Sequence, residues 1–171
     1  RKQRPSDALT VRHGVVPEPR QAVIPAGRTT LGARLDEIPF GWDNEFPRIA
    51  RDVPSFAIDV HNVTNRQFLE FVEAGGYSNK AWWSESDWLW RTGAGVDHPP
   101  FWSRQGDEWF WRGMFVLIPL PPAWPVYVSQ AEANAYARWK GLRLPTEAEY
   151  HRAAFGTPEG TERSHPWGEA P

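Results

Sequence analysis

The order of apolar and polar residues predicts an amphipathic helix over about residues 65–74. Phe68, Leu69, Phe71 and Val72 fall on one face at helical spacing, while the positions between them are mostly polar. Two glycines follow this stretch and are typical of a helix end. We therefore expect the first helix of the chain here.

Two more helices are expected further along the chain, over residues 130–140 and 147–155. In the first of these, Ala135, Tyr136 and Trp139 recur on one face, and a glycine follows the stretch. The second stretch begins after a proline and also ends before a glycine. Both have the length of an ordinary globular helix.

Each of the three expected helices starts with a capping box, in which a hydroxyl residue is followed three residues later by Glu or Gln. The hydroxyl oxygen accepts from the backbone N–H of the third helical residue, and that residue's side chain accepts from the backbone N–H of the cap. The pairs are Thr64 with Gln67, Ser129 with Glu132, and Thr146 with Glu149.

Glu147, Glu149 and His151 lie close together and raise the alternative of a metal site or a general base. Glu149 is explained as the partner of a capping residue, and Glu147 as a negative charge in the first turn, where the helix dipole favours it. His151 is then an early residue of the same helix. The helix cap is the interpretation we adopt for this stretch.

Strands are expected before the first helix. Phe56, Ile58 and Val60 alternate with other residues, which is typical of a half-buried strand. Two short β-prone runs flank residues 25–27, Pro-Ala-Gly, and this arrangement predicts a hairpin between them.

The region between residues 82 and 112 is expected to contain a short helix and not a continuous one. Ser84 with Asp87 resembles a looser capping box, and the helix is expected to end near Gly93. Further glycines and two adjacent prolines follow and interrupt any continuation.

The composition narrows the class of protein. The chain has 171 residues, enough for one domain with a core, and its net charge of −2 gives no reason to expect a nucleic acid as partner. The absence of cysteine excludes disulfides, thiolate metal sites and a cysteine nucleophile within this chain. The longest apolar run, "MFVLIPLPPAW", is broken by prolines and too short to cross a membrane.

Tryptophan is the most unusual feature of the composition. The chain has 11 of them, and seven fall between residues 82 and 111. Most such rings pack in cores, but a dense cluster can also line a pocket or an interface. Both interpretations stay open for this segment.

The sequence "LPTEAEYHRAA", followed by "HPWGEA", resembles the signature of the formylglycine-generating-enzyme-like domain, also called the sulfatase-modifying-factor fold. Tyr150 stands where that family usually has Trp, and His151 where it usually has Glu. The stretches "IDVHNVTNRQFLEFVEAGGY" and "VYVSQAEANAYARWKG" are similar to the family's first and second helices with the residues before them.

A narrower resemblance is to the iron-dependent sulfoxide synthases of ergothioneine biosynthesis. "FGWDNEFPR" is similar to a segment of these enzymes, and the Trp-rich residues at about 77–115 look like an insertion that they carry. This resemblance implies an α+β, loop-rich fold of formylglycine-generating-enzyme-like or C-type-lectin-like type, with short antiparallel strands and capped helices. It also implies that residues 1–22 are a linker after a DinB-like helical domain absent from this chain. Residues 23–171 would be the N-terminal part of the enzyme-like domain.

The implied activity is that of an oxidoreductase. Such enzymes use a non-haem Fe(II) and O₂ to join the sulfur of cysteine or γ-glutamylcysteine to hercynine, as a sulfoxide. In the family the iron ligands belong to the preceding helical domain, so this chain alone is expected to be catalytically incomplete, with no catalytic residue and no metal ligand of its own. The other implied partners are that helical domain and the C-terminal half of the same fold, and the implied location is the cytoplasm, with no nucleic acid or membrane involved.

Individual residues support the expectation that the iron ligands lie outside this chain. The five histidines have no helical or His-x-His spacing that would favour a metal site. They are His13, His61, His98, His151 and His165. The Trp-rich insertion is the best functional candidate. The residues that could border a substrate channel are Trp82, Trp83, His98, Phe101 and Trp102.

Two other functions remain open. A formylglycine-generating oxidase of sulfatases would share the fold, and the Trp-rich insertion argues against it. A non-catalytic C-type-lectin-like binding module would share the fold without any chemistry. Iron content and turnover of hercynine with a thiol distinguish the three.

Overall fold

The computed structural model describes residues 14–168. Most of the expected linker, including His13, lies outside the described residues, and residues 14–20 contain neither helix nor strand. The chain divides into two compact units, each formed by segments far apart in the sequence. Arg1–Glu18 with His61–Leu144 forms the first unit, and Pro19–Val60 with Pro145–Pro171 forms the second.

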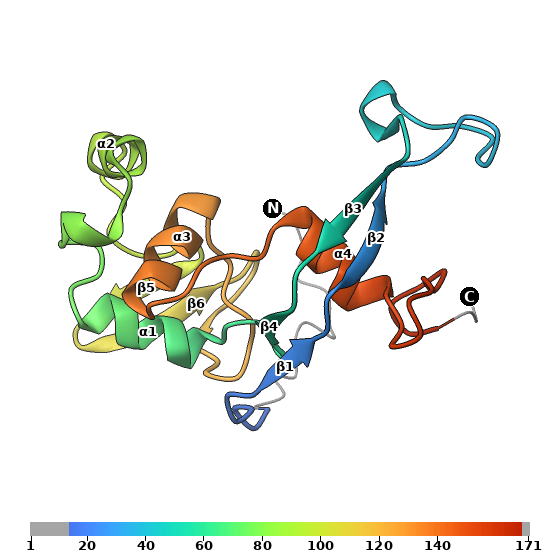
Figure 1. Cartoon of the computed structure of the whole chain (residues 1–171). Coiled ribbons are helices and arrows are strands. Elements are labelled where there is room, and N and C mark those ends of the chain that lie inside the picture. The colour runs from blue at the N-terminus through green and yellow to red at the C-terminus, as the bar shows by residue number, and fades with distance from the viewer. Residues whose placement is uncertain (1–13, 169–171) are drawn as a thin grey trace. The chain divides into compact units, whose positions relative to one another are not determined.

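The first unit combines helices with a three-stranded antiparallel sheet in the order β5-β6-β7 (Figure 1). Its regular elements, in chain order, are α1 (Asn65–Glu73), the 3-10 turn η2 (Lys80–Trp82), α2 (Glu85–Gly93), β5 (Trp102–Gln105), β6 (Glu108–Arg112), β7 (Leu117–Pro119) and α3 (Gln130–Trp139). The Trp-rich region is therefore a turn, a short helix and a sheet. As expected, no continuous helix runs through it.

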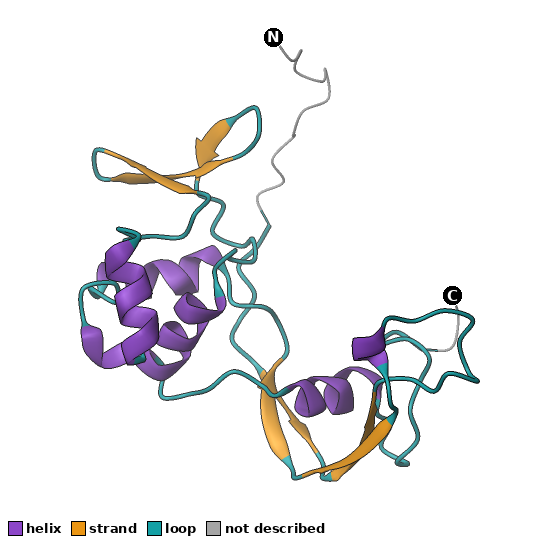
Figure 2. Cartoon of the chain, turned by 90° about the horizontal axis from the view of Figure 1, so that it is seen from above, coloured by secondary structure: helices purple, strands orange, loops and turns teal. Residues whose placement is uncertain are grey.

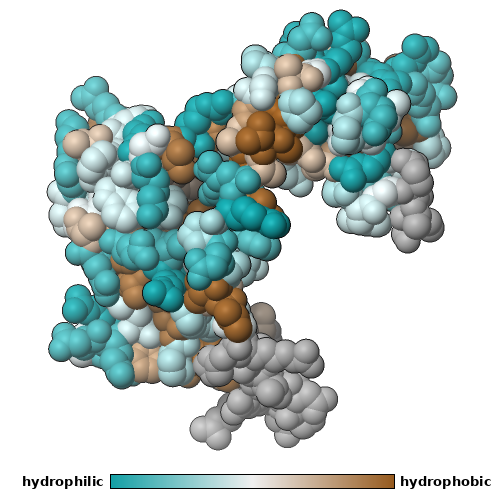
Figure 3. All heavy atoms as spheres, turned by 60° about the horizontal axis from the view of Figure 1, so that its bottom comes forward, coloured by the Kyte–Doolittle hydropathy of each residue, from teal (hydrophilic) through white to brown (hydrophobic). Residues whose placement is uncertain are grey.

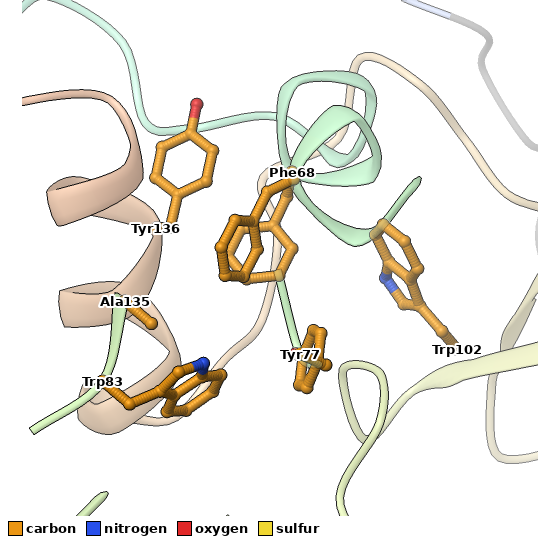
Figure 4. Packing of buried hydrophobic residues seen from close by; sticks show 7 residues of the cluster. Phe68, Tyr77, Trp83, Trp102, Ala135 and Tyr136 are labelled. Carbon is orange, nitrogen blue, oxygen red and sulfur yellow. The ribbon is translucent and has the colours of Figure 1, made fainter. Parts of the chain in front are cut away.

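Aromatic rings from α1 and α3, with Tyr77, Trp83 and Trp102 between these helices in the chain, form the core of the first unit (Figure 4). Phe71 is fully buried, and Phe68 stacks on Tyr136 with ring centroids 5.2 Å apart. Phe71 contacts the edge of the Tyr136 ring at 6.0 Å. These residues belong to the apolar faces predicted from helical spacing. The apolar face of α1 therefore packs against that of α3.

The second unit is a long two-stranded ribbon with one helix beside it (Figures 1 and 2). Its elements are β1 (Gln21–Ile24), β2 (Gly27–Leu31), the 3-10 turn η1 (Asp43–Glu45), β3 (Ile49–Val53), β4 (Phe56–Asp59) and α4 (Glu147–Phe155). β1 pairs with β4 and β2 pairs with β3, both antiparallel. α4 packs on β2 and β3. A two-stranded ribbon is marginally stable alone, so the helix supplies its apolar cover.

The predicted hairpin around residues 25–27 is wrong, although both of its strands exist. β1 and β2 follow one another along one side of the ribbon, and each pairs with a strand whose residues lie between 18 and 38 positions later. The ladder keeps one register on both sides of an interruption that contains Pro25 and Pro54. Proline has no N–H to donate to a ladder, so a break between two collinear strand pairs results. The hydroxyl of Ser55 donates to the carbonyl of Ile24 across this break, at 3.0 Å.

The helix boundaries follow the capping boxes. α1, α3 and α4 each begin directly after the hydroxyl residue expected as cap, and in each the reciprocal pair of hydrogen bonds is formed. In α4, the backbone N–H of Thr146 donates to the Glu149 carboxylate at 2.8 Å, and the N–H of Glu149 donates to the Thr146 hydroxyl at 3.2 Å. The mixture of capped helices and small antiparallel sheets is an α+β fold.

Within residues 14–168, no helix is both long and apolar enough to cross a lipid bilayer. Apolar side chains nevertheless reach the surface in both units, and the face drawn in Figure 3 shows brown patches among polar side chains. The most exposed of the large apolar residues include Val15, Val23, Leu35, Phe40, Met114 and Trp167.

Removing the hydroxyl of the α4 cap is expected to weaken the fold. Thr146→Ala leaves the N–H of Glu149 without its acceptor, so the free energy of unfolding should fall by about 1 kcal/mol. Thr146→Ser keeps the hydroxyl and should stay close to the wild type. Denaturant unfolding of the three proteins measures the difference. Equal stability of the Ala and Ser variants would show that the cap contributes nothing.

Candidate functional site

The Trp-rich segment of the first unit, residues 77–115, is attached to the core at its beginning by Tyr77 and Trp83. Trp83 is 6% exposed, and its indole N–H donates to the carbonyl of Gly76 at 2.9 Å. Gly76 has no room for a side chain, because a Cβ there would lie 2.2 Å from the ring of Phe71. The segment therefore leaves the core along a path that a larger residue at position 76 would block.

Tyr77 makes the second attachment through its hydroxyl group. The phenol donates to one oxygen of the buried Glu132 carboxylate at 2.5 Å. The other oxygen of Glu132 accepts from the backbone N–H and the hydroxyl of Ser129, at 2.7 and 2.8 Å. Burial, followed by the neighbouring negative charge of Glu132, raises the pKa of Tyr77 well above its ordinary value. The phenol is thus held in its protonated, donating form.

Trp102 and Trp109 connect the core to the surface of the segment. Trp102 is 3% exposed and packs edge-on against Trp109, with ring centroids 5.5 Å apart. The imidazole of His98 lies 5.6 Å from the ring of Trp109, and the guanidinium of Arg104 lies 5.7 Å from the same ring. A ring nitrogen of His98 is paired with the carboxylate of Asp97. This pairing fixes the orientation of the imidazole beside the indole.

Phe101 and Trp82 occupy different places. Phe101 is 44% exposed and meets the exposed ring of Tyr127 edge-on, at 5.8 Å. Trp82 is half-buried against the core, and its backbone carbonyl accepts from Arg138 of α3 at 3.0 Å. Of these two, Phe101 is the exposed residue.

The structure thus separates the residues suggested as borders of a substrate channel. Trp83 and Trp102 are core side chains, and Trp82 packs against that core. Phe101 is exposed, and His98 is partly exposed, with 35% of its side chain accessible. Asp97, Arg104 and Trp109 lie around His98, whereas Tyr127 contacts Phe101, and none of these four was suggested as a channel residue from the sequence. The alternation of residues in β6 placed Trp109 on a strand face, but only the tertiary fold brings His98 to it.

This surface combines aromatic faces, a guanidinium and an imidazole–carboxylate pair. Arg104 lies beside an indole and is paired with Asp107 at 3.5 Å, and its planar guanidinium can stack on a planar group. The arrangement suits contact with a small polar ligand.

His151 of α4 lies in the second unit, at a hollow of about 250 Å³ between the helix and the β2–β3 ribbon. Its ring contacts the rings of Tyr150 and Phe155, with centroids at 6.1 and 5.4 Å. Glu162 borders the same hollow and accepts from the N–H of Thr30 at 2.7 Å. Burial opposes ionisation of Glu162, but hydrogen bonds from Thr30 and Thr29 outweigh it and lower the pKa of the carboxyl.

The residues that the structure describes contain no group of three or more His, Asp or Glu side chains placed to hold a metal ion. Glu149 and Glu132, which have the right chemistry, each use a carboxylate oxygen in a capping box. Glu132 and Glu149 are therefore parts of the helix frame.

Comparison with known proteins gives the relationships of the chain. The model of the family described as "Sulfatase-modifying factor enzyme 1-like domain" matches residues 7–171. The hercynine oxygenase of Mycolicibacterium thermoresistibile is 41% identical over 143 residues, 82% of this chain and 31% of that protein. The hercynine oxygenase of Mycolicibacterium smegmatis is 40% identical over 86% of this chain and 34% of its own length. The formylglycine-generating enzyme of Streptomyces coelicolor is 34% identical over 96% of this chain and 57% of its own.

The chain therefore spans about a third of the length of the hercynine oxygenases that it matches. It spans about half of the formylglycine-generating enzyme.

The buried phenol of Tyr77 predicts a particular loss of stability at alkaline pH. The folded state keeps the phenolic proton, whereas the unfolded chain releases it near the usual pKa of 10.0. The stability that this group contributes is complete below that pH and is lost as the pH rises through it, by up to about 1.4 kcal/mol per pH unit. Tyr77→Phe should remove this slope and, at neutral pH, cost about 1–3 kcal/mol because Glu132 loses a donor.

Tyr127→Phe is the matched control, since Tyr127 is 62% exposed. It should leave both the neutral stability and the alkaline slope of the wild type nearly unchanged. Urea unfolding at several pH values between about 7 and 11 measures both quantities. An identical alkaline slope for the wild type and Tyr77→Phe would contradict the assignment of a buried, protonated phenol.

Proposed function

The chain belongs to the sulfatase-modifying factor enzyme 1-like family, and from this premise we propose that it is part of an oxygenase acting on hercynine. The observation that carries the proposal is its greater identity to hercynine oxygenases than to a formylglycine-generating enzyme. The Trp-rich segment supports it, because its sequence resembles an insertion of the sulfoxide synthases. Because the chain spans only about a third of these relatives, the activity is proposed for the complete protein.

In its finer form, the proposal is an Fe(II)- and O₂-dependent sulfoxide synthase that joins the sulfur of cysteine or γ-glutamylcysteine to hercynine. Residues 14–168 do not fit an iron site, since they bring together no three side chains able to ligate one. We therefore assign the iron ligands to a helical domain of the complete protein outside these residues. We likewise propose that residues 1–22 connect to that domain, and that residues 23–171 begin a formylglycine-generating-enzyme-like domain of C-type-lectin-like type.

The contribution proposed for this chain is to hold and orient substrate. Among the predicted channel residues, Phe101 is exposed and His98 is partly exposed, and Trp109 with Arg104 lies beside His98. Aromatic faces next to charged groups bind small polar molecules while excluding water from one side. The core tryptophans, Trp83 and Trp102, support this surface from below.

A second candidate function is oxidation of a sulfatase cysteine to formylglycine. It is supported by the relative from Streptomyces coelicolor, of which this chain covers a larger share. A non-catalytic binding module is the third outcome that an assay of the complete protein distinguishes.

The complete protein should turn over hercynine with a thiol. Incubation with Fe(II), air, hercynine and either cysteine or γ-glutamylcysteine is expected to yield the coupled sulfoxide, detected by its mass. A cysteine-containing sulfatase peptide should remain unmodified in a parallel reaction. Formylglycine in that peptide, without a hercynine product, would establish the second function instead, and binding of hercynine without any product would establish the third.

Metal analysis is the companion measurement. The complete protein is expected to hold about one iron, whereas the 171-residue chain should retain none after dialysis. Stoichiometric iron on the 171-residue chain would place the metal chemistry within it and contradict the division of roles proposed above.

His98→Ala in the complete protein is expected to raise KM for one of the two substrates about tenfold, equivalent to about 1.4 kcal/mol of lost binding. His61→Ala is the control, because His61 is exposed in the same unit and outside the Trp-rich segment. Steady-state kinetics with each substrate varied in turn measures the effect. Equal KM values for the two variants and the wild type would remove His98 from the substrate site.

A further inference from the structure

Arg152 is a buried cation in the second unit. It belongs to α4 and is only 4% exposed. Its guanidinium lies against Gly27 of β2, where an added Cβ would come within 2.7 Å of both Nε and Nη2. Only glycine leaves room for the guanidinium at this crossing of helix and ribbon.

The hydrogen bonds of Arg152 leave one edge of its guanidinium unused. Nη1 donates to the carbonyl of Thr157 at 3.2 Å. Nε is buried and has no acceptor among the described residues. Within residues 14–168, Arg152 takes part in no ion pair, and the carboxylate one turn earlier in its helix, Glu149, accepts from Thr146.

Arg34 of the same unit shows what this edge of a guanidinium binds. Its Nε and Nη2 donate to the two oxygens of Asp36, at 2.9 and 2.8 Å. That pair lies at the surface, where solvation makes pairing optional. Arg152 presents the corresponding edge under burial, where a charge without a counter-ion is strongly unfavourable. Pairing with a carboxylate is therefore expected much more strongly for Arg152 than for Arg34.

We propose that Arg152 binds a carboxylate where α4 crosses β2. A carboxylate is the favoured class because its two oxygens match the Nε–Nη2 edge in a bidentate pair. Gly27 also borders a hollow of about 350 Å³ on the ribbon, but the lining of that hollow, which includes Arg28 and Asp52, does not include Arg152. Arg28 is already paired with Asp52 at 3.3 Å, so it does not compete for the ligand. The site is independent of the hercynine oxygenase proposal.

The carboxylate has two possible sources, a free small molecule or a side chain of the complete protein outside residues 14–168. The chemistry at Arg152 is the same for both. They differ in the response to added carboxylate, because a side chain of the protein is present at high effective concentration and excludes a weak competitor.

The test uses thermal unfolding of the complete protein in sodium acetate and in sodium chloride at equal ionic strength. The variants are Arg152→Met, Arg152→Lys and, as control, Arg28→Met, which removes an exposed arginine from the same ribbon. For a free ligand, acetate should raise the Tm of the wild type and of Arg28→Met by a few degrees over chloride. It should not raise the Tm of Arg152→Met, and Arg152→Lys, which lacks the planar fork, should lose most of the response.

For a carboxylate supplied by the protein, acetate should have no specific effect, and Arg152→Met should lower the Tm more than Arg152→Lys, which keeps the charge. If Arg152→Met does not fold, the wild type, Arg28→Met and Arg152→Lys still decide the question. The proposal is overturned if acetate has no effect and Arg152→Lys is at least as damaging as Arg152→Met. It is also overturned if Arg28→Met loses the acetate response as Arg152→Met does.

Discussion

The carboxylate of Glu132 is the constraint on which the first unit depends. One of its oxygens completes the capping box that starts α3, and the other accepts from the phenol of Tyr77 at the start of the Trp-rich segment. A buried carboxylate is unfavourable unless such donors surround it, so neither half of the arrangement is stable without the other. The helix start and the attachment of the segment are therefore coupled through one side chain. The aromatic core adds burial to this frame, but the hydrogen bonds fix the position where the segment leaves it.

The second unit depends on the packing of one helix against a ribbon of strands. Its ribbon consists of strands from the early part of the chain, while the helix that covers it comes from residues 147–155. Such an arrangement needs a small residue at the crossing, and Gly27 provides it. The same crossing buries the guanidinium of Arg152. Close packing of helix on ribbon and burial of a charge are thus two consequences of one glycine.

The parts of this fold that the sequence predicts are those determined within a few residues of chain. The three capping boxes fix helix starts because donor and acceptor are three residues apart, and the structure begins α1, α3 and α4 at those places. The partners of β1 and β2 could not be predicted in the same way. Strand pairing here joins residues between 18 and 38 positions apart, and a proline-containing turn resembles a proline break within a ribbon. The Trp-rich segment has the same limit: spacing identifies its rings, but only packing separates the buried Trp102 from the accessible Phe101.

The acidic and basic residues of α4 show how structural and functional roles can be separated in a partial domain. Glu147 and Glu149 attract attention in the sequence because acidic residues near a histidine are typical of catalytic sites. Glu149 nevertheless has a structural role, in a capping box formed within its own helix.

Arg152 attracts no attention in the sequence, because a basic residue in the last turns of a helix is ordinary. Burial reverses this ranking, since Glu149 accepts hydrogen bonds from Thr146, whereas Arg152 carries a charge and a donor that no described residue satisfies. A polar group whose bonding is complete needs no ligand to explain it. A buried polar group whose bonding is incomplete needs a ligand to complete it. In α4 that group is the guanidinium of Arg152 and not one of the carboxylates before it.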